Sequence, residues 1–248
     1  MVFIEAGCFQ RGSTLFLNEG PVKEVNLSSF WIDRFPVTNE RFSKFIQDGG
    51  YQRRDLWTEA GWMFIASLSQ KLPLYWCNER WNQPRQPVTG ISWWEALAFA
   101  KSEGKMLPTE TQWEYAAGAG RNLYPWGSTS PTVDLANFAP GCEPPELNRR
   151  STLVDQHPLA ASPFGCHDMA GNLNEWCLDN SSNDYLWDRD CVNPCYIMDE
   201  FHPHIVRGGS GLHDEDCLRC ASRDYYPPEM RDNIVGIRCV INVGDVDE

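Results

Sequence analysis

The segment from Arg207 to Asn233 gathers the residue types that could do chemistry in this chain. It holds two cysteines, one histidine, two tyrosines and several carboxylic acids within a short span. A thiol site, a metal site and a ligand-binding surface are the three kinds of site that such a set allows.

Two pairs of cysteines in this part of the chain raise the question of a metal. Cys217 and Cys220 form a C-x-x-C pair, and Cys191 and Cys195 lie upstream of them. Four thiolates could bind zinc. However, Pro194 interrupts the upstream pair and the second pair lacks the usual glycine turn, so we do not expect a zinc site.

The acids before Cys217 disfavour a reactive thiol. Asp214, Glu215 and Asp216 precede it directly. Negative neighbours raise the pKa of a thiol, whereas a redox C-x-x-C needs a helix N-terminus and a nearby cation. The pair His202 and His204 is more often a solvated strand face than a set of metal ligands.

A second stretch, from His167 to Trp176, is rich in oxygen donors. Asp168, Asn172, Asn174 and Glu175 surround a single glycine. Hard cations such as calcium bind six to eight oxygens, and a glycine-bearing loop can turn carbonyls and carboxylates inward. The residues alone leave two interpretations open, a calcium loop or an exposed acidic turn before a strand.

The bulk composition narrows the class of protein. The chain has 248 residues, 42% of them hydrophobic, and a formal net charge of −13. This charge repels phosphate backbones, so nucleic acid is not an expected partner, whereas cations are. No apolar run approaches the ~20 residues of a membrane span. Without a signal-like N-terminus, we expect a cytoplasmic protein with mostly reduced cysteines, or an exported one whose targeting segment this sequence does not include.

The elements that must position these residues are few and short. Capping boxes predict helices over 92–104 and 108–118, and Phe42, Phe45 and Ile46 predict a weaker one over 38–50. Short apolar runs predict strands at 2–4, 30–32, 205–206 and 235–240, while 128–168 shows little periodicity. We expect one domain, 1–248, with many loops held by aromatic packing and bound cations.

These pieces, in this order, resemble the formylglycine-generating enzyme family, also called the sulfatase-modifying-factor domain. The motifs that carry the resemblance span nearly the whole chain: "PVTNERFSKFI", "PVTGISWWEALAFAKSEGKMLPTETQWEYAAGAG", "YPWG", "ANFA", "FGCHDMAGNLNEW", "VRGGS" and "NIVGIRCV". The resemblance implies an α+β variant of the C-type lectin fold with little regular secondary structure, stabilised by calcium.

The resemblance also implies calcium ligands. Asp168 and Glu175 would supply side-chain oxygens, and Gly171 and Leu173 would supply carbonyls. A second site would begin at Asn137 and the carbonyl of Phe138, with Asp155 as a further candidate.

Departures from the family pattern fall at its active site. Ser210 matches the family serine, but His213 occupies the position of the first copper-binding cysteine, and Cys217 lies near the second but out of register. Copper(I) needs two soft ligands, so formylglycine generation is not expected. Asn174 replaces the usual tryptophan.

The family's structural disulfides are not expected either. Cys220 and Cys239 match positions that form such bridges in some members. The partner positions fall on alanines, near Ala117 and Ala100.

Two functions remain. The first is a non-catalytic module that binds a protein or small-molecule ligand through 207–235, in one version a variable protein of a diversity-generating retroelement. Arg219, Ala221, Arg223, Gly236 and Arg238 would hold its frame. The expected ligand-binding residues are Leu212, His213, Asp214, Asp216, Asp224, Tyr225 and Tyr226. The alternative is a metal-dependent oxidase acting on a peptide or small molecule, using His213, Cys217 and Ser210 with copper or iron.

Overall fold

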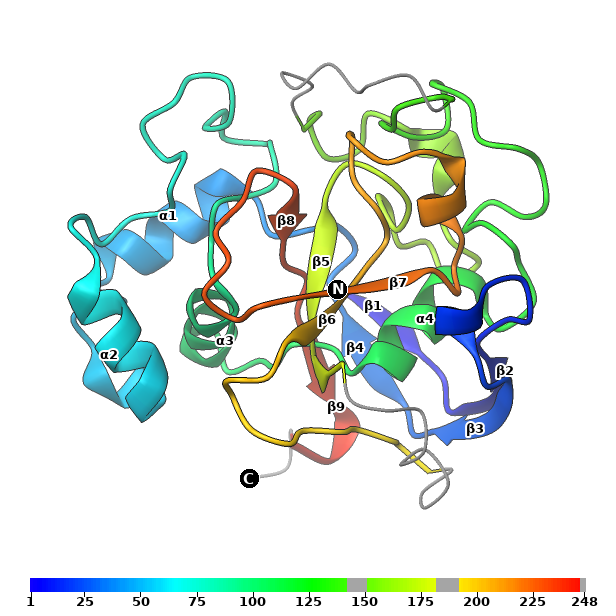
Figure 1. The fold of residues 1–248 in the computed structure, drawn as a ribbon, viewed down its shortest axis with the longest axis horizontal. Coiled ribbons are helices and arrows are strands. Elements are labelled where there is room, and N and C mark those ends of the chain that lie inside the picture. The colour runs from blue at the N-terminus through cyan, green and yellow to red at the C-terminus, as the bar shows by residue number, and fades with distance from the viewer. Residues whose placement is uncertain (142–150, 182–191, 246–248) are drawn as a thin grey trace.

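The computed structural model describes residues 1–141, 151–181 and 192–245 (Figure 1). Within these ranges the chain forms short helices and short strands joined by long irregular segments. No helix in the described part of the chain is long and apolar enough to cross a membrane.

The strands form three small sheets. The first is antiparallel, in the order β1 (Val2–Ile4), β4 (Phe30–Ile32), β9 (Val240–Asn242). The second is a hairpin of β2 (Gly7–Arg11) and β3 (Lys23–Leu27). The third has the order β7 (Arg223–Tyr226), β6 (His204–Arg207), β5 (Asn174–Asn180), β8 (Val235–Gly236), with β8 parallel to β5.

The helices begin where the sequence predicts. In α3 (Trp93–Ser102) the Ser92 and Glu95 side chains form the capping box, and Thr109 does the same with Gln112 in α4 (Glu110–Gly118). The predicted helix at 38–50 is α1 (Asn39–Gln47), capped by Thr38.

Two elements differ from expectation. Helix α2 (Glu59–Ser67) was not predicted because its sequence is apolar around most of the helix and contains Gly61. That glycine lies against Trp94, so tertiary packing favours it. The single strand expected over 235–240 is split into β8 and β9. Between them, the carbonyls of Ile237 and Cys239 accept backbone hydrogen bonds from Val37 and Asp33.

The four-stranded sheet separates two hydrophobic clusters. Because successive residues of a strand face opposite sides, Val206 packs with the cluster around α3 and Ile205 with the cluster around α4. Figure 1 shows α3 and α4 on either side of β5 and β6. The 207–235 segment therefore leaves a rigid, buried strand, β6, and returns to the sheet edge as β7.

Candidate functional site

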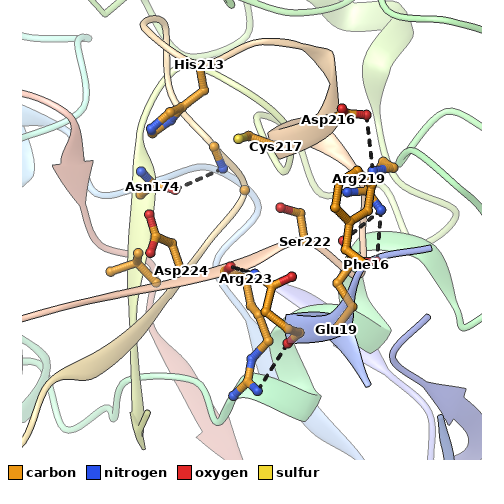
Figure 2. A pocket seen from close by; sticks show the side chains of 14 residues that line it. Phe16, Glu19, Asn174, His213, Asp216, Cys217, Arg219, Ser222, Arg223 and Asp224 are labelled. Atoms are coloured by element: carbon orange, nitrogen blue, oxygen red, sulfur yellow. Dashed lines mark hydrogen bonds and ion pairs between the residues drawn. The ribbon is translucent and has the colours of Figure 1, made fainter. Parts of the chain in front are cut away.

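A cavity of about 250 Å³ opens where the chain leaves β6 and returns as β7. Figure 2 shows the labelled side chains surrounding it, with His213, Cys217 and Asn174 on one side and Phe16 and Arg219 on the other. Its lining combines three distant parts of the chain: Phe16, Asn18, Glu19, Asn174, Val206, Gly208, Gly209, His213, Asp216, Cys217, Arg219, Ser222, Arg223 and Asp224.

A buried carboxylate anchors the strands beneath this cavity. Glu110, at the start of α4, lies 2.7 Å from Arg223 Nε, 3.2 Å from Arg11 Nη2 and 3.8 Å from Arg207 Nη1. Burial alone would raise the pKa of Glu110, but the three guanidinium groups lower it to about 2. The positive charge of Arg223 is therefore compensated inside the protein.

The opposite wall is also an internal ion pair. Arg219 Nη1 lies 2.7 Å from Glu19 Oε1 in the 3₁₀ helix η1 (Leu17–Glu19), and the guanidinium stacks 4.1 Å from the centroid of the Phe16 ring. Asp216 is only loosely paired, with its Oδ1 3.9 Å from Arg219 Nε. The basic residues of the cavity are thus used internally, while the Asp216 and Asp224 side chains are exposed.

His213 is held as a neutral donor. The Ser210 backbone N–H donates to His213 Nδ1 at 3.0 Å, so Nδ1 must be an acceptor and the proton lies on Nε2. Ser210 Oγ also lies 3.0 Å from Nδ1. Burial lowers the pKa of His213, although Asp224 and Asp214 oppose this effect. His213 therefore presents a fixed, uncharged imidazole at the cavity.

Among the described cysteines, Cys217 is the one that lines the cavity. Burial raises the pKa of its thiol to about 11, with Asp214 and Asp224 adding to the effect, as the sequence predicted for a thiol preceded by acids. Within the described ranges, no three His, Cys, Asp or Glu side chains converge as a metal site would need.

The other described cysteines are also unbridged. Cys220 and Cys239 are buried free thiols, as expected. Cys220 packs against Gly118 of α4, the neighbour of Ala117. Of the four cysteines considered for zinc, Cys191 lies outside the described residues, and the remaining three are free.

Asn174 forms part of the cavity wall and was not among the expected ligand residues. It is 2% exposed, its Oδ1 accepts a hydrogen bond from Gly209 N at 3.0 Å, and its Nδ2 donates to the Tyr226 hydroxyl at 3.5 Å. Burial and the hydrogen bond with Asp224 raise the pKa of Tyr226. The signal that could have identified Asn174 is its departure from the family tryptophan.

Only part of the expected ligand-binding set meets at the cavity. His213, Asp216 and Asp224 line it, whereas Leu212, Asp214, Tyr225 and Tyr226 do not. Asp214 caps the 3₁₀ helix η5 (Glu215–Leu218), and Tyr225 is 56% exposed on the outer strand β7. Phe16, Asn18 and Glu19 were missed because they lie about 200 residues away in the sequence.

His204 corrects a sequence interpretation. It is fully buried and stacks on Trp93 with ring centroids 3.7 Å apart, so the pair His202 and His204 is not a solvated strand face. Its Nδ1 bonds the Leu178 carbonyl, and burial lowers the pKa of the ring to about 4. His204 is a core residue.

The predicted calcium loop has one carboxylate that fits a cation. Asp168 is buried, its Oδ2 has no hydrogen-bond partner, and burial raises its pKa to about 6. An unpaired buried carboxylate is costly, and a bound cation would remove that cost. Gly171 has φ +76°, and a Cβ there would meet the Asn137 carbonyl oxygen at 2.5 Å, so this loop needs a glycine.

The second carboxylate of the loop is already engaged. Both oxygens of Glu175 accept hydrogen bonds from Arg238 at 2.8 Å, and Trp113 Nε1 donates to Oε2 at 2.7 Å. Asp155 forms an ion pair with Arg85. The unpaired Asp168 carboxylate is thus the group of this loop that fits a cation, while Glu175 would have to share its oxygens with Arg238.

The fold and the site place the chain in a known class. It matches the sulfatase-modifying factor enzyme 1-like domain over residues 1–243, and it belongs to that family. It is similar to the hercynine oxygenase of Mycolicibacterium thermoresistibile (32% identity, 91% of this chain, 54% of that protein). The formylglycine-generating enzyme of Thermomonospora curvata is 31% identical (96% of this chain, 92% of that protein). The chain thus spans about half of the hercynine oxygenase.

Solved structures agree with the fold. PvdO from Pseudomonas aeruginosa superposes with a TM-score of 0.73 at 20% identity, covering 97% of this chain and 93% of that one. Treponema denticola variable protein 1 superposes with a TM-score of 0.66 at 18% identity, covering 98% and 94%. The expected formylglycine-generating-enzyme-like variant of the C-type lectin fold is therefore confirmed.

Proposed function

We propose that the chain, as a single domain, is a ligand-binding module whose cavity beside 207–235 takes a positively charged group. One observation carries this proposal: Arg219 and Arg223 form close ion pairs with the buried Glu19 and Glu110, whereas Asp216 and Asp224 are exposed and form no such close pair with any described residue. The cavity is therefore locally negative beyond the overall charge of −13. A negative, half-enclosed site selects cations.

The fold supports this role. The cavity lies beside the segment that connects the paired strands β6 and β7, so the sheet holds both ends of that segment. Loops on a rigid scaffold are the usual place for ligand recognition. The similarity to a variable protein supports the same display role for 207–235, with either a protein or a small molecule as partner.

The test is a charge-matched ligand screen. Thermal unfolding is followed with lysine, spermidine, tetramethylammonium and the anion succinate at low salt. We expect stabilisation by cations only, lost in Asp216→Asn/Asp224→Asn. Glu229→Gln, an exposed acid in the same segment but outside the cavity, is the matched control. Equal stabilisation by succinate, or no effect of the double substitution, would rule the proposal out.

The second candidate is a metal-dependent oxidase. It is favoured by the presence of His213 and Cys217 at one cavity and by the similarity to a hercynine oxygenase and a formylglycine-generating enzyme. Elemental analysis of the purified protein separates the two. Stoichiometric copper or iron that disappears in His213→Ala or Cys217→Ala would favour the oxidase over the cation-binding module.

We also propose that calcium binds at Asp168 with the backbone carbonyls of Gly171 and Leu173. Its role there would be structural, because it would neutralise the buried Asp168 carboxylate and fix the loop that leads into β5. The Asn137 and Phe138 segment would hold a second ion in the same way, since Asn137 packs against Gly171.

A further inference from the structure

We infer that the cavity recognises a primary ammonium group and discriminates against a quaternary one. Asp224 is the counter-ion, and the small side chain of Asn174 leaves the base of the cavity open. This inference rests on the proposed function and sharpens it to one class of cation. The primary ammonium could come from a free amine or from a lysine side chain, and the chemistry is the same for both.

The first step is the supply of hydrogen-bond acceptors. A primary ammonium has three N–H donors and a compact, strongly hydrated charge, so it needs acceptors to replace water. The cavity offers the Asp224 and Asp216 carboxylates and the Ser222 hydroxyl. Figure 2 shows Asp224 below Asn174 and Ser222 nearer to Arg219. A quaternary ammonium has no N–H group, so it is attracted by the negative charge but forms no hydrogen bond with these acceptors.

The second step is the shortage of aromatic surface. Quaternary ammonium groups are usually bound by the faces of several aromatic rings. Phe16 is the only aromatic residue that lines the cavity, and the Arg219 guanidinium stacks on its ring at 4.1 Å. A cage of rings is thus missing among the described residues of the wall, and the ring that is present already binds a cation of the protein.

The third step is the way Asp224 is held. Its Oδ1 accepts the Tyr225 backbone N–H at 2.8 Å, and its carboxylate helps to raise the pKa of the neighbouring Tyr226 phenol. Because the Tyr226 oxygen accepts from Asn174 Nδ2, its own proton is directed to Asp224. Asn174 therefore orients the counter-ion through Tyr226. A large side chain at 174 would instead fill the base of the cavity.

The experiment compares two probes that differ only in methylation. Binding of n-butylamine and of trimethylbutylammonium is titrated by NMR at low salt, on the full chain. We expect butylamine to bind at least about tenfold more tightly, with both affinities falling in Asp224→Asn. Asn174→Trp should abolish butylamine binding. Tyr226→Phe keeps the shape of the cavity and should also weaken butylamine binding. This variant serves as the test if Asn174→Trp does not fold.

The outcomes separate the two proposals. If trimethylbutylammonium binds as well as butylamine and both need Asp224, the ammonium inference is wrong while the cation-binding function survives. If neither probe responds to Asp224→Asn, the proposed function itself fails. Replacing butylamine by a lysine-containing peptide and its norleucine counterpart identifies the source, because a lysine-dependent gain over butylamine supports a polypeptide and no gain supports a free amine.

Discussion

The buried carboxylate of Glu110 provides a quantitative test of how the cavity is held. In Glu110→Gln the side chain keeps its shape, but Arg11, Arg207 and Arg223 lose a shared counter-ion. Lowering the pKa of Glu110 from 4.5 to about 2 corresponds to roughly 3 kcal/mol. Removing one partner of a buried ion pair commonly costs about 3–5 kcal/mol. We therefore expect the free energy of unfolding to fall by about 3–5 kcal/mol at pH 7.

The pH dependence gives this prediction a second check. The folded-state pKa of Glu110 is lowered, so its contribution is present above the unfolded value of 4.5 and is lost as pH falls towards 2. The stability difference between the wild type and Glu110→Gln should be constant from about pH 5 to pH 8 and should shrink progressively as pH falls from 4.5 towards 2.

The assay is urea unfolding followed by the fluorescence of the 11 tryptophans. Glu103→Gln is the matched control, because Glu103 also bonds an arginine, Arg41, but is partly exposed, and we expect it to cost less than about 1 kcal/mol. Adding Arg223→Gln to Glu110→Gln should recover stability by removing an unpaired charge. A cost below about 1 kcal/mol for Glu110→Gln at pH 7, or a difference at pH 3 that is as large as at pH 7, would refute the reasoning.

Three further predictions follow from single groups. Chelation of calcium should lower the melting temperature by about 5 °C or more, and Asp168→Asn should remove that sensitivity; an unchanged transition argues against the ion. The pKa of His204 in the folded state is about 4, below the unfolded value of 6.5. The stability that the neutral ring contributes is therefore lost as pH falls from 6.5 to about 4. The stability advantage of the wild type over His204→Gln should shrink by about 3 kcal/mol across this range, measured by thermal unfolding at a series of pH values. Iodoacetamide at pH 8 should alkylate the exposed Cys77 before Cys217, whose thiol pKa is about 11; mass spectrometry showing the reverse order would contradict that value.

Local features of the sequence were the most predictable. The capping boxes at Ser92 and Thr109 involve residues three positions apart, so the starts of α3 and α4 could be identified without the fold. Helix α2 could not, because Gly61 is favourable only through its contact with Trp94. The split between β8 and β9 depends on backbone partners near Asp33, which no local pattern reveals.

The candidate site shows the same division. Sequence alone placed His213, Asp216 and Asp224 on one segment, and the structure brings all three to one cavity. It could not supply the opposite wall, because Phe16 and Glu19 reach Arg219 across 200 residues of sequence. The resemblance to the family supplied the calcium candidates, which the isolated residues had left undecided.

The property that matters most for ligand binding is which charged side chains of the cavity lack an ion-pair partner. The amino-acid composition of the segment cannot predict this. Counting residues shows acids and arginines side by side in 207–235, which suggests internal neutralisation along the segment. The structure pairs Arg219 and Arg223 instead with Glu19 and Glu110, from outside the segment. The segment's own acids at positions 216 and 224 are thereby left for a ligand. The cation binding that we propose thus depends on glutamates outside the segment, which pair with its arginines.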